Sequence, residues 1–335
     1  MNKVLDLPFD QYGKHMQAYN MINALRKPGE KFSILDVGGY MGNTKLVQKN
    51  DSVTILDIFD VEEEGYIKGD ATNMQLGDNS YDFVVNFDVL EHITPNDRGK
   101  FLDEITRVAR IGVVVAAPTN TPTNELAEKL LNDDFKKLYQ VSHPWLKEHI
   151  ENVIPDMEKV DKYLNKIGLK TIVTANNDTD LWVQMLGIAF ISNKIPQLQS
   201  KVKELNSFYN ATTVSLDASL VHGEFSYRKI IMAVKKDDDY KKLNEWLIKN
   251  YSDINPVTKI TLENKILSTY AELLDELNAT AVKNSRHINT LKKEIETLTS
   301  YKDQLAALQS SLSWGVTKPL RAIRRVATRL AGGVK

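Results

Sequence analysis

One stretch near the N-terminus constrains the fold more than any other part of the chain. Residues 33–44 read Ser-Ile-Leu-Asp-Val-Gly-Gly-Tyr-Met-Gly-Asn-Thr, an apolar run followed by a glycine-rich turn and by residues that can cap a helix. Glycine permits tight turns and close backbone approach. A strand that turns sharply into a helix brings backbone N–H groups against a bound ligand. The stretch therefore predicts an α/β fold with a ligand site at this turn.

Two further apolar runs end in polar residues. Residues 53–57 end at Asp57, whose carboxylate can accept hydrogen bonds from two ribose hydroxyls. Residues 81–87 are followed by three polar side chains, those of Asp88, Glu91 and His92. Because ligands of open α/β sheets bind beyond the carboxyl ends of the strands, we expect these strand ends to form one site.

These motifs resemble those of the class I S-adenosylmethionine-dependent methyltransferases, of the methyltransferase-11 type, over roughly residues 30–118. The matching segments are 36–42, 57, 69–71, 81–83 and 87–92. The sequence departs from the family's usual pattern at Tyr40, which stands where a glycine is expected. The resemblance implies a Rossmann-like methyltransferase fold, an α/β doubly wound and mostly parallel sheet of seven strands.

The resemblance also implies S-adenosyl-L-methionine as the cofactor and assigns residues to it. The glycines cradle the methionine portion above Asp36, and Asp57 holds the ribose. Two residues after the third strand hold the adenine edge, and two at the end of the fourth strand line the pocket. The cofactor-binding residues are then Asp36, Gly38, Gly39, Gly42, Asp57, Asp70, Ala71, Phe87 and Asp88.

The alternation of strands and helices predicts a methyltransferase domain over residues 1–236. Its elements include an amphipathic helix over 10–27, a helical insertion at about 119–150, helical structure over 180–210 and a last strand over 225–234. Beyond this domain we expect a linker over 237–257, a coiled coil over 258–310 and a basic amphipathic tail over 311–335.

The coiled-coil prediction rests on apolar residues at spacings of three and four between Leu267 and Leu308. Asn284 at one seam position would fix the register, most simply in a parallel dimer, and a trimer stays open. We therefore expect a homo-oligomer, and the alternative is an isolated surface helix.

Charge is distributed unevenly along the chain. Residues 311–335 hold six basic and no acidic side chains, whereas the other residues hold 37 basic and 44 acidic ones. An acidic body argues against a nucleic-acid substrate. The tail, with Trp314 at the start of residues 312–330, suits either the anionic inner face of a plasma membrane or a partner protein. Without a signal segment or an apolar run of about 18 residues, we expect a cytoplasmic protein, peripheral at that membrane.

The Ser-Leu-Ser-Trp and Pro-Leu-Arg segments of residues 311–321 resemble a C-terminal motif of bacterial glycosyltransferases and methyltransferases that build surface polysaccharides. The resemblance implies a glycan or a nucleotide-sugar type of precursor as the substrate. The reaction expected is transfer of a methyl group to a sugar hydroxyl.

An alcohol acceptor calls for a general base. We choose His143 first, because Trp145 beside it suits the face of a sugar. His92 comes second and His149 third, and Glu91 belongs with His92 to the family motif. The alternatives are a structural role for His143 in the insertion and a loop-positioning role for Glu91 and His92.

No metal site is expected. The carboxylates of Asp133 and Asp134 could assist a metal, but their context fits a charge pair on a helix surface. The chain has no cysteine, which excludes thiolate zinc sites and disulfides. Two other functions stay open, an inactive scaffold that assembles glycan enzymes and a methyltransferase of another small molecule.

Overall fold

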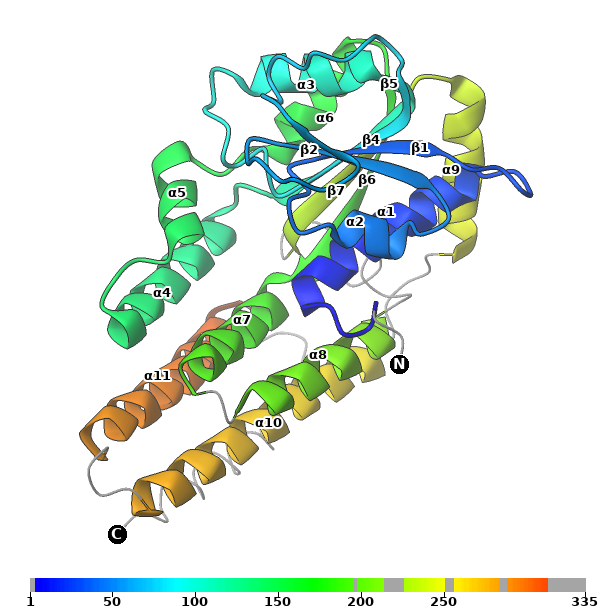
Figure 1. The fold of residues 1–335 in the computed structure, drawn as a ribbon. Coiled ribbons are helices and arrows are strands. Elements are labelled where there is room, and N and C mark those ends of the chain that lie inside the picture. The colour runs from blue at the N-terminus through cyan, green and yellow to red at the C-terminus, as the bar shows by residue number, and fades with distance from the viewer. Residues whose placement is uncertain (1–3, 196–197, 214–225, 251–255, 284–287, 313–335) are drawn as a thin grey trace.

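The computed structural model describes residues 4–195, 198–213, 226–250, 256–283 and 288–312 (Figure 1). Its strands are β1 (Ser33–Val37), β2 (Ser52–Asp57), β3 (Tyr66–Lys68), β4 (Tyr81–Phe87), β5 (Ala109–Pro118), β6 (Lys170–Asp178) and β7 (Ser226–Val234). Its helices are α1 (Phe9–Leu25), α2 (Asn43–Val47), α3 (Arg98–Val108), α4 (Pro122–Tyr139), α5 (Pro144–Asn152), α6 (Met157–Lys166), α7 (Thr179–Lys194), α8 (Gln199–Thr213), α9 (Asp237–Asn250), α10 (Pro256–Lys283) and α11 (Ile288–Leu312).

The strands form one seven-stranded sheet in the order β3-β2-β1-β4-β5-β7-β6. All neighbours are parallel except β7, which runs antiparallel to both β5 and β6. The register places Val37 opposite both Leu56 and Asn86, so β1, β2 and β4 end at the same edge of the sheet. The predicted doubly wound, mostly parallel sheet is confirmed, and its carboxyl edge gathers the predicted site residues.

Helices cover both faces of this sheet (Figure 1). One face packs against α3 and α6 and the other against α1 and α9. The central strand β5 is buried on both faces, and its Val113 and Val114 are fully buried in opposite core clusters. Strands that are buried on both faces are typical of parallel sheets and need continuous apolar runs, as here.

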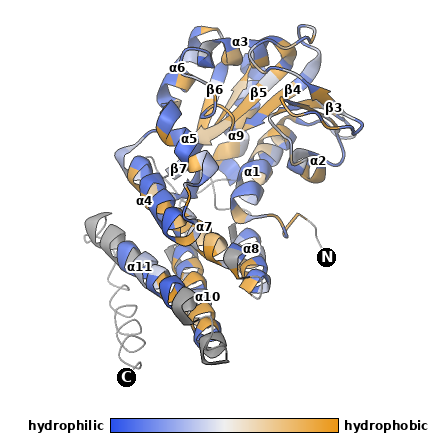
Figure 2. Ribbon diagram, turned by 60° about the vertical axis from the view of Figure 1, so that its left-hand side comes forward, coloured by the Kyte–Doolittle hydropathy of each residue, from blue (hydrophilic) through white to orange (hydrophobic). Residues whose placement is uncertain are grey.

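A second hydrophobic core lies beside the sheet and is built from helices α4, α5, α7, α8, α10 and α11. Helix α7 is apolar around most of its circumference, and Figure 2 shows its hydrophobic colouring. Its Leu181, Met185 and Ile188 are almost completely buried. Because a helix that is apolar all round must be covered on all sides, α7 organises this unit.

This packing corrects two of the domain boundaries. The stripe predicted to drive a coiled coil instead buries Leu277, Leu298 and Tyr301 in the same core as α4, α7 and α8. The stripe lies on two helices and not on one: α10 ends at Lys283, and α11 runs back beside α10 (Figure 1). The physical reason is the apolar surface of α7, which this stripe covers within one chain. Self-association stays a prediction.

The expected linker at 237–257 contains helix α9, which packs its buried Leu243 against α1, β6 and β7. The helical stretch expected over 180–210 divides into α7 and α8. Helices α4 and α5 occupy the range expected for the insertion, 119–150. The predictions for Asn284 and for residues 313–335, including the membrane contact, lie outside the described residues. None of the helices that the structure describes has the length and apolar character needed to span a membrane.

Candidate active site

The glycine turn joins β1 to α2 and leaves no room for side chains. Gly38 has φ +81°, and a Cβ there would stand 2.1 Å from Cγ2 of Val89. A Cβ on Gly39 would stand 2.0 Å from Oδ2 of Asp36. Gly42 has φ +70° and closes the turn with a hydrogen bond from its N–H to the Gly39 carbonyl, 2.8 Å long. These glycines are therefore required by geometry, and the turn presents bare backbone as the cofactor cradle demands.

Asp36 lies directly beneath this turn, as the sequence predicts, and is 1% exposed. Burial raises the pKa of its carboxyl group to about 7, against the opposing effects of the Thr44 hydroxyl and of Lys14. The group therefore exchanges a proton near neutrality. Its position supports the turn from below.

Polar groups and exposed rings follow β2 and β3. Asp57 is 8% exposed and accepts a hydrogen bond from the Phe59 N–H over 3.2 Å. Asp70 is exposed and accepts two from Thr72, each 2.7 Å long. The rings of Tyr40 and Phe59 are both more than half exposed and lie 5.3 Å apart between centroids. Exposed apolar side chains beside a carboxylate suit the two ends of an adenosine. Tyr40, where the family pattern has glycine, thus faces solvent and leaves the turn closed.

Asp88 has partners that the sequence did not reveal. Its carboxylate accepts from Lys14 Nζ over 2.6 Å and from Arg228 Nε and Nη2 over 2.5 and 2.6 Å. Burial raises the pKa of Asp88, but the two cations outweigh it and hold the pKa well below its usual range. Both cations are almost fully buried. Asp88 itself has φ +54°, a rare conformation outside glycine.

This ion triad ties α1, β4 and β7 together at the carboxyl edge of the sheet. Asp88 was predicted to line the cofactor pocket, and the structure shows its carboxylate engaged within the protein. Phe87, predicted beside it, is 9% exposed and packs against the ring of His15, 4.3 Å between centroids. The signal that could have revealed the triad is Arg228, a charged residue near the start of β7, just before its apolar run.

His143 is the N-cap residue of α5 and lies among aromatic rings. Its imidazole contacts Phe135, Trp145 and Phe190, with centroid distances of 4.8 to 5.5 Å. Burial, together with His149, lowers its pKa to about 4. The ring is thus neutral at neutral pH and a weak base. The aromatic contacts agree with the structural role that was the alternative for this residue.

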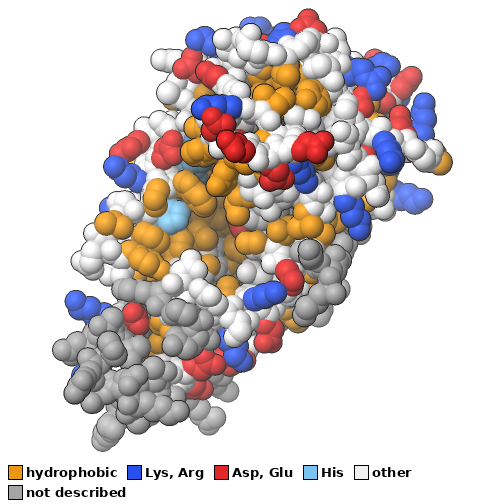
Figure 3. Space-filling model, viewed as in Figure 1, with side chains coloured by type: hydrophobic (Ala, Val, Ile, Leu, Met, Phe, Trp, Pro, Cys, Tyr) orange, Lys and Arg blue, Asp and Glu red, His pale blue; other side chains and the backbone are white. Residues whose placement is uncertain are grey.

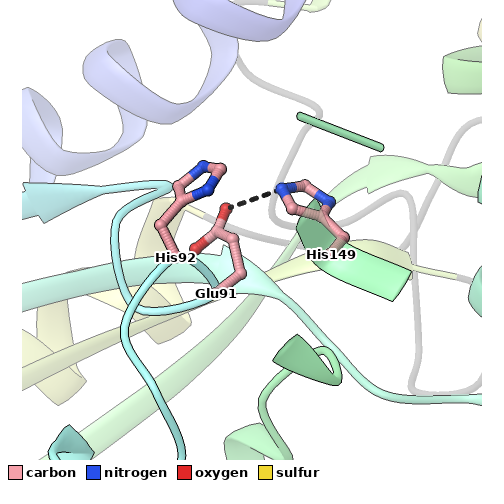
Figure 4. A group of neighbouring side chains, drawn as sticks. All are labelled: Glu91, His92 and His149. Carbon is pink, nitrogen blue, oxygen red and sulfur yellow. Dashed lines mark ion pairs between the residues drawn. The ribbon is translucent and has the colours of Figure 1, made fainter. Parts of the chain in front are cut away.

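The other candidates meet in one group, formed by Glu91, His92 and His149 (Figure 4). Glu91 and His92 come from the loop after β4, and His149 from α5. Glu91 Oε1 lies 4.0 Å from His149 Nε2, and the two imidazole centroids lie 5.0 Å apart. The sequence named all three residues, but only the fold brings His149 to the other two.

The group is buried and held by further carboxylates. Glu91 is fully buried, and burial raises its pKa to about 8. Glu128 Oε1 lies 3.0 Å from His149 Nδ1. Burial disfavours the charged imidazole, but Glu128 and Glu91 raise the pKa of His149. Glu148 Oε2 lies 2.9 Å from His92 Nδ1. The insertion α4–α5 therefore supplies one histidine and the carboxylates that orient both.

The loop that carries Glu91 and His92 adjoins the glycine turn. Val89, two residues before Glu91, is the side chain that a Cβ on Gly38 would strike. The space-filling view is hollowed between the sheet and α4–α5, and mainly hydrophobic side chains line the hollow (Figure 3). Asp133 and Asp134, weighed as metal ligands, lie on α4 and pair with Lys136 and Lys137. Asp134 is fully buried, so it is not the surface charge that the sequence suggested.

The strand order and the glycine turn define a Rossmann-like α/β domain. Residues 40–117 match the family model described as "Methyltransferase domain". The chain therefore carries a methyltransferase domain and is an enzyme whose methyl donor is S-adenosyl-L-methionine. The residues present fit this cofactor, because the cradle at Gly38 and Gly39 excludes any side chain.

Similar solved structures cover about two thirds of the chain. One is a SAM-dependent methyltransferase from Archaeoglobus fulgidus, 14% identical, covering 66% of this chain and 92% of its own, with a TM-score of 0.40. Another is magnesium protoporphyrin IX methyltransferase from Synechocystis PCC 6803 with bound SAH, 14% identical, covering 67% and 84%, with a TM-score of 0.39. No curated protein matches this sequence.

Proposed function

We propose that this enzyme transfers the methyl group of S-adenosyl-L-methionine to a hydroxyl group of a sugar, in a bacterial surface glycan or its precursor. One observation carries the proposal, the group of Glu91, His92 and His149 next to the cofactor cradle. An alcohol must lose its proton as it attacks, and a carboxylate with two imidazoles suits that task. We place this task here rather than at His143, because aromatic rings surround that imidazole.

The protein's contribution to such a reaction is alignment and proton transfer. S-adenosyl-L-methionine supplies a methyl group on a positively charged sulfur; the acceptor oxygen gains this methyl, and the donor leaves as a neutral thioether. The glycine turn and Asp57 hold the donor, and proximity can contribute roughly 7–11 kcal/mol to lowering the barrier. The proton of the acceptor hydroxyl passes to the Glu91–His92–His149 group and from there to solvent.

A sugar acceptor is supported by the hydrophobic walls of the hollow and by an exposed ring at the start of α5. Trp145 is 62% exposed and follows directly on Pro144 at the start of α5. Aromatic faces of this kind can stack on the C–H face of a sugar ring. The polysaccharide setting rests on the C-terminal motif of residues 311–321, so it is an inference from the sequence alone. The peripheral membrane location and the homo-oligomer stay proposals of the same kind.

The test has two parts. Calorimetric titration of the full chain with S-adenosyl-L-methionine should show saturable binding, which Asp57→Ala weakens at least tenfold. Asp60→Ala is the matched control, because this carboxylate stands three residues on, pairs with Lys68 and is 73% exposed. Nucleotide sugars and oligosaccharides are then screened with donor that carries a radiolabelled methyl group.

We expect label in a sugar product, as a methyl ether that mass spectrometry locates on one oxygen. Saturable cofactor binding with transfer only to nitrogen or carbon acceptors would contradict the proposed acceptor. A folded chain that binds no cofactor would favour the inactive scaffold instead.

A further inference from the structure

The Glu91 carboxylate poses a problem that the proposed chemistry does not solve. It is fully buried, and neither oxygen is hydrogen-bonded to another of the described residues. An unpaired buried polar group costs about 1–3 kcal/mol, and more if it is charged. Nε2 of His149 is also buried without a hydrogen-bond partner in the described structure. The Glu91 carboxyl group and His149 Nε2 therefore face each other across 4.0 Å without a hydrogen bond between them.

We infer that Glu91, His92 and His149 bind one divalent transition-metal ion. Each offers one donor atom, and the three atoms lie within 4.8 Å of one another. Ligands at about 2.0–2.2 Å from a zinc ion stand roughly 3.5 Å apart, so small side-chain rotations close the triangle. Two imidazoles and one carboxylate form a ligand set that suits Zn²⁺, Co²⁺ and Mn²⁺ and leaves coordination positions open.

The surroundings of the group are those of a metal centre. Histidine ligands usually donate their second ring N–H to a carboxylate, which fixes the tautomer and leaves the other nitrogen for the metal. Glu128 takes this position at His149 Nδ1, and its Oε1 also accepts from the Tyr227 hydroxyl over 2.7 Å. Glu128 is itself 1% exposed. At His92, the 46% exposed Glu148 carboxylate lies 2.9 Å from Nδ1 as a possible ion-pair partner of the charged ring.

The two segments that carry the ligands are clamped together. Arg98 donates to the carbonyls of Leu90 and Ile93 in the loop after β4, and also to those of Asn152 and Val153 at the end of α5. The Asn152 amide donates to the His92 carbonyl over 3.3 Å. Hydrogen bonds from the side chains of Arg98 and Asn152 to backbone carbonyls therefore hold the two ligand-bearing segments together without any ion. A site organised in advance loses little entropy on binding.

The role of the ion rests on the proposed function. An acceptor hydroxyl at an open coordination position would have its oxygen polarised and its pKa lowered, as metal-bound water has. With the ion in place, its three ligands would no longer take up the proton, which would leave to water instead. The oxygen would be held beside the cradle through Glu91 and Val89, which lies against Gly38. The ion would thereby favour reaction of a hydroxyl acceptor, because a metal-bound oxygen keeps a lone pair for the attack and a metal-bound amine does not.

Cobalt spectroscopy tests the binding without any methyl transfer. The full chain is treated with a chelator, then titrated with Co²⁺, followed by its visible absorption bands, and afterwards with Zn²⁺. We expect one equivalent of Co²⁺ that Zn²⁺ displaces. Glu91→Gln and His149→Gln should weaken binding at least a hundredfold, and Glu128→Gln about 10- to 100-fold. His143→Gln is the matched control, a histidine six residues from His149 and outside the group, and should bind as the wild type does.

Circular dichroism establishes whether each variant folds. If His149→Gln does not fold, the Co²⁺ affinities of His92→Gln, at a partly exposed residue, and of Glu128→Gln test the inference in its place. A folded wild-type chain without stoichiometric Co²⁺ binding would overturn the inference. So would unchanged binding by the folded ligand variants. Cofactor titration in the same samples separates the two proposals, because loss of the ion should leave cofactor affinity within about twofold. Metal binding without transfer to any sugar would contradict the acceptor alone.

Discussion

The cofactor side and the acceptor side of the site are built in different ways. On the cofactor side, one continuous stretch of chain from β1 to α2 supplies the cradle, and its geometry follows from glycines and one buried aspartate. On the acceptor side, the loop after β4 and the insertion α4–α5 meet across more than 50 residues of sequence. Local sequence therefore determines the shape of the cradle, whereas tertiary packing determines the geometry of the Glu91–His92–His149 group.

The largest effect on cofactor binding should come from the cradle. Gly39→Ala places a Cβ 2.0 Å from Asp36 Oδ2, so either the turn or the carboxylate must move. We expect at least a hundredfold loss of affinity for S-adenosyl-L-methionine in a calorimetric titration. Gly77→Ala is the control, because nothing lies within 4 Å of its added Cβ and the position is exposed. Equal affinities of the two variants would show that donor binding does not depend on this turn.

Among the effects on stability, that of the buried triad should be the largest. Lys14→Met leaves Asp88 with one cation, and removing one member of a buried ion pair costs about 3–5 kcal/mol. Lys68→Met makes the same change in the exposed pair with Asp60 and should cost under about 1 kcal/mol. Urea unfolding measures both free energies. Similar costs would mean that the triad does not stabilise the carboxyl edge of the sheet.

The helical unit gives the third prediction. Tyr301 of α11 is 1% exposed and packs closely against Gly187 of α7. A Cβ added to Gly187 would lie only 2.9 Å from Cε1 of Tyr301. Tyr301→Ala should reduce the free energy of unfolding by about 3 kcal/mol, because it opens a cavity in this core. Ile248→Ala, at a residue 71% exposed, serves as the control.

The concentration dependence of the same measurement decides between packing within one chain and self-association. We expect the midpoint of the Tyr301→Ala unfolding curve to be independent of protein concentration, because α7 of the same chain covers this part of the core. A midpoint that rises with concentration would instead support the predicted coiled-coil oligomer.

The cofactor side could be predicted from the sequence better than the acceptor side, because local sequence patterns determine its shape. The strands, the turn and Asp36 could be predicted, because apolar runs and glycines act over a few residues. The packing of Tyr301 on α7 could not, because a stripe at spacings of three and four fits any apolar partner. Lys14 and Arg228 were missed because a buried ion pair leaves no periodic pattern. His149 was ranked only third, since its proximity to Glu91 depends on how α5 folds back.

The smallest effect is a pH dependence that belongs to the cofactor side alone. Burial raises the pKa of Asp36 from its ordinary value of 3.8 to about 7 in the folded state, so the folded chain holds this proton where the unfolded chain has lost it. The contribution of the neutral Asp36 carboxyl group to the free energy of unfolding is therefore fully present below pH 3.8, the pKa of the unfolded state. It declines as the pH rises towards about 7, the pKa of the folded state. Relative to Asp36→Asn, the wild type should lose roughly 1 kcal/mol for each pH unit between about pH 5 and about pH 6.5. Urea unfolding of both proteins across this range measures the difference in the free energy of unfolding. A difference that stays constant with pH would mean that Asp36 remains ionised beneath the turn. Its negative charge could then attract the positively charged methyl donor.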